Sequence, residues 1–82
     1  MSKKINISDT KPNKSYYYEF VDNKSSKFWE ITVKENTYLT RFGRIGSQGR
    51  TNTKEWASQE EAVKKATQQR NAKIKKGYIF KK

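Results

Sequence analysis

Hydrophobic and polar positions alternate along the first two thirds of the chain, which predicts β-strands. The clearest case is KFWEITV, where Trp29, Ile31 and Val33 fall on one face of an extended chain. Short polar turns separate the stretches that are rich in strand-forming residues. Four strands are predicted, at YYYEFV (16–21), KFWEITV (27–33), YLTRFGRIG (38–46) and RTNTKEW (50–56). Strands at this spacing favour an antiparallel meander.

The period of the pattern then changes, and residues 58–76 are predicted to form one α-helix. Ser58 followed three residues later by Glu61 is typical of a capping box. Good helix formers follow without interruption, and Gly77 suits the position just after a helix. The segment YIF, residues 78–80, is expected to return to the core. The fold class is therefore α+β, an antiparallel sheet of about four strands with one helix packed on one face.

Length and composition predict one small domain. Residues 1–14 are polar, contain the only proline and show no sustained period, so we expect a flexible tail there and a folded domain over residues 15–82. Cysteine and histidine are absent, which excludes disulfides, thiolate chemistry, the commonest metal ligand and the usual general base. We expect no enzyme activity, no metal site and no cofactor.

Charge adds the first functional signal. The chain carries 19 Lys and Arg against 8 Asp and Glu, a net charge of +11. Residues 1–40 hold seven Lys against five acidic residues, whereas residues 41–82 hold twelve Lys and Arg against three acidic residues. This asymmetry favours an anionic partner, nucleic acid first and an acidic protein or membrane surface second. A merely soluble basic protein is the plain alternative.

The sequence also bears on location and assembly. No apolar run approaches the ~20 residues that a membrane span needs, and the polar N-terminus lacks the apolar segment of a signal peptide. No heptad pattern or long apolar patch is present. We therefore expect a cytoplasmic monomer without a membrane partner.

The stretch RFGRIGSQGR, residues 41–50, concentrates the candidate chemistry. In an extended strand, two sets of residues would occupy opposite faces: Leu39, Arg41, Gly43 and Ile45 on one, and Tyr38, Thr40, Phe42 and Arg44 on the other. Leu39 and Ile45 are expected to face the helix, which leaves Phe42 projecting from the opposite face beside Arg44. Such a ring can stack on a base or sugar while the guanidinium holds a phosphate. The alternative places Phe42 in the core and the arginines in solvent, and a bulge at Gly43 would reverse part of the assignment.

The glycines of this stretch do not predict a cofactor site. Gly43, Gly46 and Gly49 recur every three residues, a spacing that matches neither GxGxxG nor a P-loop. Glycines at a bulge and a hairpin turn explain the spacing better.

Several separated motifs together resemble one family. The strings KFWEITV, LTRFGRIGSQGR, SQEEAVKKA and KKGY, in this order, are similar to the WGR domain, whose usual string resembles RWGRIGTxGQ. The resemblance runs from about Tyr17 to Phe80, and short bacterial proteins built almost wholly of this domain resemble the chain most. It implies an antiparallel sheet with one helix packed on it.

The resemblance also implies a function. In the DNA-dependent poly(ADP-ribose) polymerases, a domain of this type binds broken DNA ends, where its Trp packs on a terminal nucleotide and its Arg contacts the backbone. By position, Phe42 takes the stacking role, Gly43 gives close backbone approach and Arg44 contacts the phosphate. Phe42 keeps a flat apolar face but lacks the area and the N–H donor of an indole. The chain also has Ser26 at a position where the polymerases resemble one another by having an asparagine.

Three functions are therefore compared. The first is a nucleic-acid-binding module, with double-stranded DNA preferred and DNA ends as a candidate target. Its expected binding residues are Phe42, Gly43 and Arg44, with Lys27, Arg41, Arg50, Lys75 and Lys76 as candidate phosphate contacts. The second is an adaptor that binds an acidic protein. The third, an enzyme, is rejected because the chain lacks His, Cys and any Ser-based catalytic motif.

Overall fold

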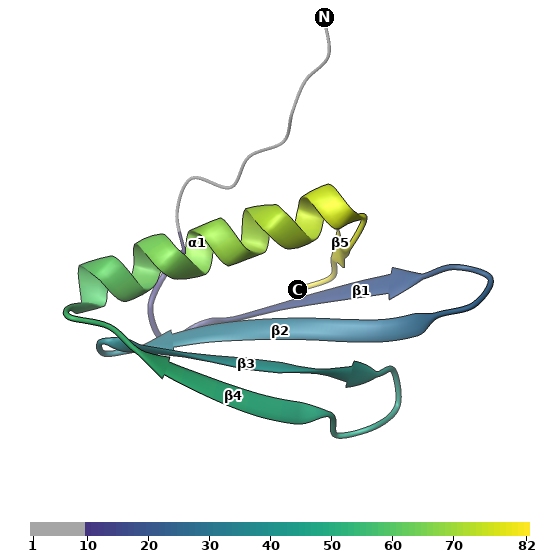
Figure 1. The fold of residues 1–82 in the computed structure, drawn as a ribbon, viewed down its shortest axis with the longest axis horizontal. Coiled ribbons are helices and arrows are strands. Elements are labelled where there is room, and N and C mark those ends of the chain that lie inside the picture. Colours follow the sequence, from purple (N-terminus) through teal and green to yellow (C-terminus); the bar gives the residue numbers. More distant parts are fainter. Residues whose placement is uncertain (1–9) are drawn as a thin grey trace, which may run out of the picture.

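A computed structural model describes residues 10–82 of the chain as a five-stranded antiparallel sheet with one helix on one face (Figure 1). The elements in chain order are β1 (Ser15–Val21), β2 (Ser26–Lys34), β3 (Thr37–Arg44), β4 (Arg50–Glu55), α1 (Gln59–Lys76) and β5 (Ile79–Phe80). The strands lie in the order β4-β3-β2-β1-β5. The predicted α+β class and four-strand meander are confirmed, and the short β5 adds a fifth strand beside β1.

The turns between the strands set the register of the sheet. Only two residues, Glu35 and Asn36, separate the paired ends of β2 and β3, and Glu35 adopts a left-handed φ of 54°. The β1–β2 turn is stabilised by Asp22, whose Oδ1 accepts hydrogen bonds from the backbone N–H groups of Lys24 and Ser25 at 2.9 and 2.6 Å. Such an Asx turn fixes the local backbone without tertiary help.

The core lies between the sheet and α1. On the sheet side, aromatic and β-branched residues of β1 and β2 are buried, namely Tyr16, Tyr18, Trp29, Ile31 and Val33. On the helix side, Ala62 and Ala66 are fully buried, and their small size lets the helix approach the aromatic layer closely. The alternation predicted for β2 is therefore confirmed.

Both ends of α1 are capped as the sequence indicated. The Ser58 side chain accepts a hydrogen bond from the Glu61 backbone N–H at 3.1 Å. Gly77 ends the helix in the left-handed region at φ 108°, with its N–H donating to the Ile74 carbonyl at 3.0 Å. This reversal brings Tyr78 back against the core, while Phe80 is half exposed.

Loss of the N-cap hydrogen bond should measurably weaken the domain. We expect Ser58→Ala to lower the free energy of unfolding by about 1 kcal/mol, because it removes the acceptor for a helix N–H. Ser58→Gly is the matched control and should cost only about a few tenths of a kcal/mol. Urea unfolding followed by circular dichroism measures both. Equal losses for the two variants would contradict a role for the cap.

The segment before β1 packs against the domain from residue 10 onward. Thr10 is buried, its hydroxyl lies 2.8 Å from that of Thr67, and it accepts a hydrogen bond from the Arg70 guanidinium at 2.9 Å. Arg70 is itself buried, donates to the Tyr18 hydroxyl at 2.8 Å and stacks 3.6 Å from the centroid of the Tyr16 ring. Residues 10–14 of the expected tail are thus part of the packed structure, and residues 1–9 lie outside the described residues.

Candidate functional site

The side of strand β3 that faces the helix is the one that carries Tyr38 and Phe42, which is opposite to our prediction. Pairing with β2 places Phe42 opposite Trp29 and Tyr38 opposite Val33, so both rings lie on the helix side of the sheet. Leu39 therefore lies on the other face, since neighbouring strands share the sidedness of paired residues. The prediction that Leu39 and Ile45 face the helix, with Phe42 on the opposite face, was wrong.

Phe42 nevertheless stays accessible, because the helix covers only part of this face. Helix α1 packs against β2 and β3, and every residue of the edge strand β4 is exposed. Phe42 is half-buried and packs against the core at its base. Together with Tyr78 it borders two hollows in the surface, one on each side.

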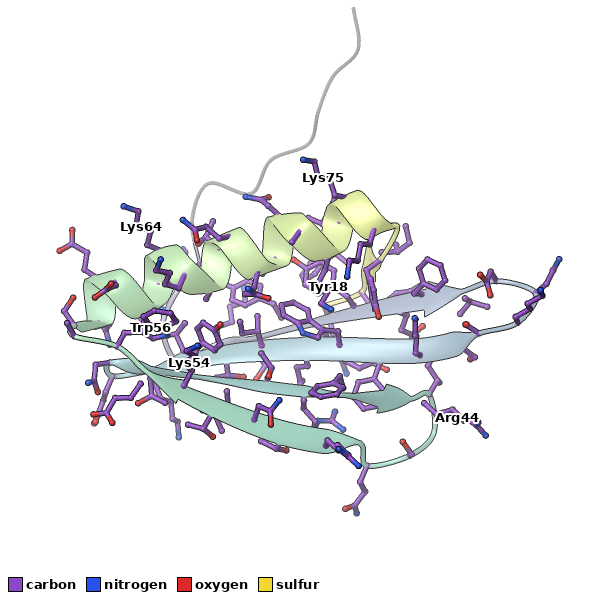
Figure 2. All side chains as sticks on the ribbon, in the orientation of Figure 1. Tyr18, Arg44, Lys54, Trp56, Lys64 and Lys75 are labelled. Atoms are coloured by element: carbon purple, nitrogen blue, oxygen red, sulfur yellow. The ribbon has the colours of Figure 1, made fainter. Side chains whose placement is uncertain are left out.

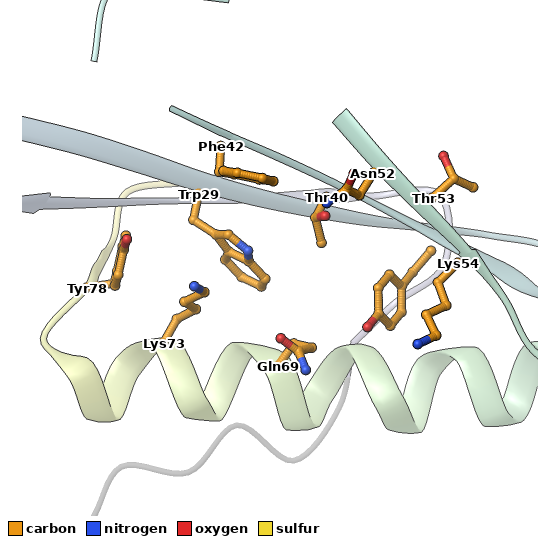
Figure 3. A pocket seen from close by; sticks show the side chains of 10 residues that line it. Trp29, Thr40, Phe42, Asn52, Thr53, Lys54, Gln69, Lys73 and Tyr78 are labelled. Atoms are coloured by element: carbon orange, nitrogen blue, oxygen red, sulfur yellow. The ribbon is translucent and has the colours of Figure 1, made fainter. Parts of the chain in front are cut away.

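The first hollow lies between α1 and the outer strands, and we call it the helix hollow (Figure 3). Its volume is about 480 Å³. Aromatic rings, amides and two lysines line it: Trp29, Tyr38, Thr40, Phe42, Asn52, Thr53, Lys54, Gln69, Lys73 and Tyr78. In Figure 3 the side chains of Gln69 and Lys73 rise from the helix toward the sheet residues.

The second hollow, about 420 Å³ in volume, lies at the β1–β2 turn, and we call it the turn hollow. Basic and hydroxyl groups dominate its lining, which comprises Lys24, Ser25, Ser26, Lys27, Phe28, Phe42, Gly43, Arg44 and Tyr78. Lys27 and Arg44 are exposed cross-strand partners of β2 and β3, so both side chains lie on the same side of the sheet as Phe42. This hollow is suited to a phosphate group.

Lys73, one of the two lysines of the helix hollow, lies over two aromatic rings. The Lys73 Nζ lies 5.4 Å from the centroid of the Trp29 ring and 5.2 Å from that of Tyr78. Burial lowers the pKa of Lys73, and the charges of Lys76 and Lys27 lower it further. Lys73 is therefore near enough to Lys76 and to Lys27 to be repelled by both, and a bound anion would relieve that repulsion.

Arg41, a predicted phosphate contact, lies away from this surface. It projects from the opposite face of the sheet, where its Nε donates to the Glu30 carboxylate at 3.0 Å. Its second nitrogen donates to the Gln48 carbonyl at 2.9 Å, and its guanidinium stacks 4.6 Å from the centroid of the buried Phe28 ring. Arg41 thus covers Phe28 and holds the β3–β4 turn, and it does not share a face with Phe42.

Gly43 has a structural role where β3 meets the β3–β4 turn. A β-carbon on Gly43 would lie 2.8 Å from the Gly49 Cα, and one on Gly49 would lie 2.5 Å from the Phe42 carbonyl oxygen. The β3–β4 turn therefore folds directly against the strand, and regular pairing of Gly43 with Phe28 leaves no bulge. The Ser47 hydroxyl and N–H both donate to the Arg44 carbonyl, at 2.7 and 3.0 Å, which fixes the backbone that carries the Arg44 side chain.

The remaining predicted residues divide between two regions. Arg50 pairs with Phe42 across β3 and β4 and is exposed on the same side of the sheet. Lys76 is exposed and close enough to Lys73 to lower its pKa. Lys75 points away from the sheet on the outer surface of the helix (Figure 2). Arg50 and Lys76 therefore lie near the two hollows, whereas Lys75 does not.

Two residues that line the hollows, Lys73 and Tyr78, were not predicted from the sequence as site residues. Lys73 follows the buried stripe of α1 by helical spacing, seven residues after Ala66 and three after Arg70. That spacing was available as a signal. Tyr78 was assigned to the core, and the sequence gives no sign that one edge of its ring borders a hollow.

Within residues 10–82, no group of three or more His, Cys, Asp or Glu residues could hold a metal ion. Within the same range, no helix is long and apolar enough to cross a membrane.

Comparisons with known proteins agree with the fold and the motifs. The sequence pattern of the WGR domain matches residues 14–82. YfeS, an uncharacterized protein of Escherichia coli strain K12, is 40% identical over 57 residues, which are 70% of this chain and 23% of that protein. The crystal structure of a Bacteroides fragilis protein matches the fold with a TM-score of 0.83 and 35% sequence identity. The matched region is 84% of this chain and 20% of the Bacteroides fragilis chain.

The chain thus spans only about a fifth to a quarter of the length of these two relatives. The family that it matches is of a nucleic-acid-binding type. Since the match takes in all five strands and the helix, the chain belongs to the WGR domain family.

Proposed function

We propose that the chain binds double-stranded DNA through a surface formed by Phe42, Tyr78, Lys27, Arg44, Lys73 and Lys76, here named the basic aromatic surface. The observation that carries this proposal is the position of Phe42. Its ring lies between two hollows, one lined by amides and rings and the other by basic and hydroxyl groups. Stacking on a base or sugar contributes about 1–3 kcal/mol, and nearby cations bind the phosphates.

The shape of this surface favours a DNA end over the middle of a duplex. Phe42 is half-buried between the helix and β4, so its ring does not project far enough to enter a continuous base stack. A terminal base pair or sugar can lie against the ring without unstacking its neighbours. Ser25, Lys27 and Arg44 at the adjacent turn hollow would then contact the terminal phosphates.

Salt dependence and end preference test this proposal together. A labelled, blunt, 5′-phosphorylated duplex is titrated at several salt concentrations beside a dumbbell of the same sequence with both ends closed. If four phosphates are neutralised, the logarithm of the affinity falls with log salt at a slope of about −3.6. The open duplex should bind more tightly than the dumbbell. A slope near zero would exclude binding through phosphates.

Removal of the Phe42 ring should lower the affinity for the open duplex about tenfold and abolish the end preference, because stacking is lost while the charges remain. The variant Phe42→Ala is compared with Leu39→Ala, which shortens a half-buried side chain of the same strand on the opposite face. Fluorescence anisotropy gives the affinities, and circular dichroism checks folding. Equal affinities for Phe42→Ala and the parent would show that the ring makes no contact.

A second candidate is an adaptor for an acidic protein segment. The specific observation in its favour is the edge strand β4, which is exposed along its whole length and carries Arg50 and Lys54 on the helix side. An extended peptide could pair with this edge while its acidic side chains meet the two cations. A pull-down that survives nuclease treatment would favour this function over DNA binding.

A further inference from the structure

The two hollows beside Phe42 differ in the chemistry that they offer. The turn hollow presents ammonium, guanidinium and hydroxyl groups, which bind phosphate oxygens. The helix hollow presents aromatic rings and side-chain amides beside Lys54 and Lys73, and the rings and amides suit a flat heterocycle with donors and acceptors on its edge. Because Phe42 and Tyr78 line both hollows, the two sites are adjacent and one ligand can occupy them together.

The helix hollow has the size and walls of a site for a nucleobase. Its volume of about 480 Å³ falls in the range of small-molecule pockets, roughly 300–1,000 Å³. The Asn52 amide comes from β4 on one side, and the Gln69 amide comes from α1 on the other (Figure 3). Both residues are exposed, so their amides are open to a ligand. Amides in such positions form paired hydrogen bonds with base edges.

A paired base is not free to use this hollow. Its hydrogen-bonding edge already faces its partner strand, and its faces are covered by neighbouring base pairs. An unpaired nucleotide at the end of a strand has both a free edge and a free face. Its phosphate also matches the turn hollow, where basic groups lie beside hydroxyl groups.

We infer that the chain accommodates an unpaired terminal nucleotide, with its base in the helix hollow between Asn52 and Gln69 and its phosphate in the turn hollow at Lys27 and Arg44. This inference rests on the proposed function, and it adds to that function a ligand class, DNA ends with an overhang. Phe42 and Tyr78 stand at the junction, where the sugar passes from one hollow to the other.

The test isolates the contribution of the base from that of the phosphate. Four forms of one duplex are compared by competition anisotropy: blunt, with a one-nucleotide adenine overhang at the 3′ end, with the same overhang at the 5′ end, and with abasic overhangs of equal charge. For at least one polarity, the adenine overhang should bind about tenfold more tightly than its abasic counterpart, because the two differ only in the base, which supplies both stacking and hydrogen bonds. Free deoxyadenosine monophosphate is included as a competitor to identify the source of the nucleotide.

Two neighbouring glutamines provide a matched pair of variants. Gln69→Ala removes an amide from the helix hollow, whereas Gln68→Ala removes the same group from an exposed position on another surface of α1. We expect Gln69→Ala and Asn52→Ala each to reduce the ratio of adenine to abasic affinity by about three- to tenfold. The Gln68→Ala variant should keep the ratio of the parent.

The outcomes separate this inference from the proposed function. Equal affinity for adenine and abasic overhangs of both polarities, with salt-dependent binding of the blunt duplex intact, would overturn the inference alone. Loss of binding to every duplex would overturn both. If the free mononucleotide competes as well as the overhang duplex at equal concentration, a strand end is not required for binding, and this part of the inference is overturned. An adenine preference that Gln69→Ala removes and Gln68→Ala retains supports the inference.

Discussion

Replacement of Gly49 by alanine should remove a large part of the stability of this domain. The new β-carbon would lie 2.5 Å from the Phe42 carbonyl oxygen and 2.7 Å from the Phe28 Cζ, and the backbone φ of 73° is unfavourable for any side chain. Overpacking costs about 1–3 kcal/mol and left-handed strain about 1–2 kcal/mol, so the combined loss is about 2–5 kcal/mol. A domain of this size has only about 5–10 kcal/mol to lose.

Gly46→Ala is the matched control for this prediction. Gly46 lies in the same turn with φ 97°, but a β-carbon there meets nothing within 4 Å. We expect the control to lose only about 1–2 kcal/mol, the cost of the backbone conformation alone. Chemical unfolding of both variants gives the comparison. Similar losses at the two positions would show that close contact between the turn and β3 is not what stabilises this hairpin.

Reversal of two charges at the turn hollow should have the largest effect on DNA binding. The double variant Lys27→Glu with Arg44→Glu replaces the exposed cross-strand pair beside Phe42. Each lost charged contact contributes roughly tenfold, so affinity for the open duplex should fall about a hundredfold. The salt slope should lose about 1.8 of its magnitude, since two phosphate contacts disappear.

The control variant changes the net charge by the same amount at a different place on the surface. Lys64→Glu with Lys75→Glu reverses two exposed lysines on the outer surface of α1, which point away from the sheet (Figure 2). If the affinity for DNA depends only on the net charge of +11, it should fall by the same factor in both double variants. If the turn hollow is the phosphate site, the control should lose less than about fivefold at 0.15 M salt, where charges more than about 8 Å apart are largely screened.

Local sequence signals predicted most of the fold because each element is determined by nearby residues. The capping serine, the glycine after the helix and the alternation through Trp29, Ile31 and Val33 act within a few positions of the chain. Strand β5 was not predicted as a strand because two residues carry no period. Burial of Thr10 was not predicted either, since it depends on Arg70, 60 residues away along the chain.

The sidedness of β3 could not be obtained from its own residues. YLTRFGRIG has apolar residues on both faces, so alternation alone does not decide which face meets the helix. The decision lies in the two-residue turn at Glu35 and Asn36, which pairs Val33 with Tyr38 and thereby Trp29 with Phe42. A turn one residue longer would invert the strand. Arg41 keeps its predicted place on the same face as Leu39, but that face is the one turned away from the helix.

The candidate site combines a part that the sequence indicates and a part that only tertiary structure assembles. Phe42 and Arg44 share a face by simple alternation, and Lys27 joins them through strand pairing. Lys73 reaches the same surface from the last turn of α1, and Tyr78 reaches it after the left-handed reversal at Gly77. That approach depends on how the helix lies across the sheet, which no local pattern specifies.

The buried contact between Arg70 and Thr10 has a mechanical consequence. Arg70 holds Thr10 from one side of α1, while Gln69, the preceding residue, forms part of the wall of the helix hollow. Tension applied to the chain at residue 10 is therefore transmitted to the helix through the hydrogen bond between Arg70 and Thr10, and not to the sheet alone. A displacement of Thr10 is in this way coupled to the position of the helix that forms one wall of the hollow.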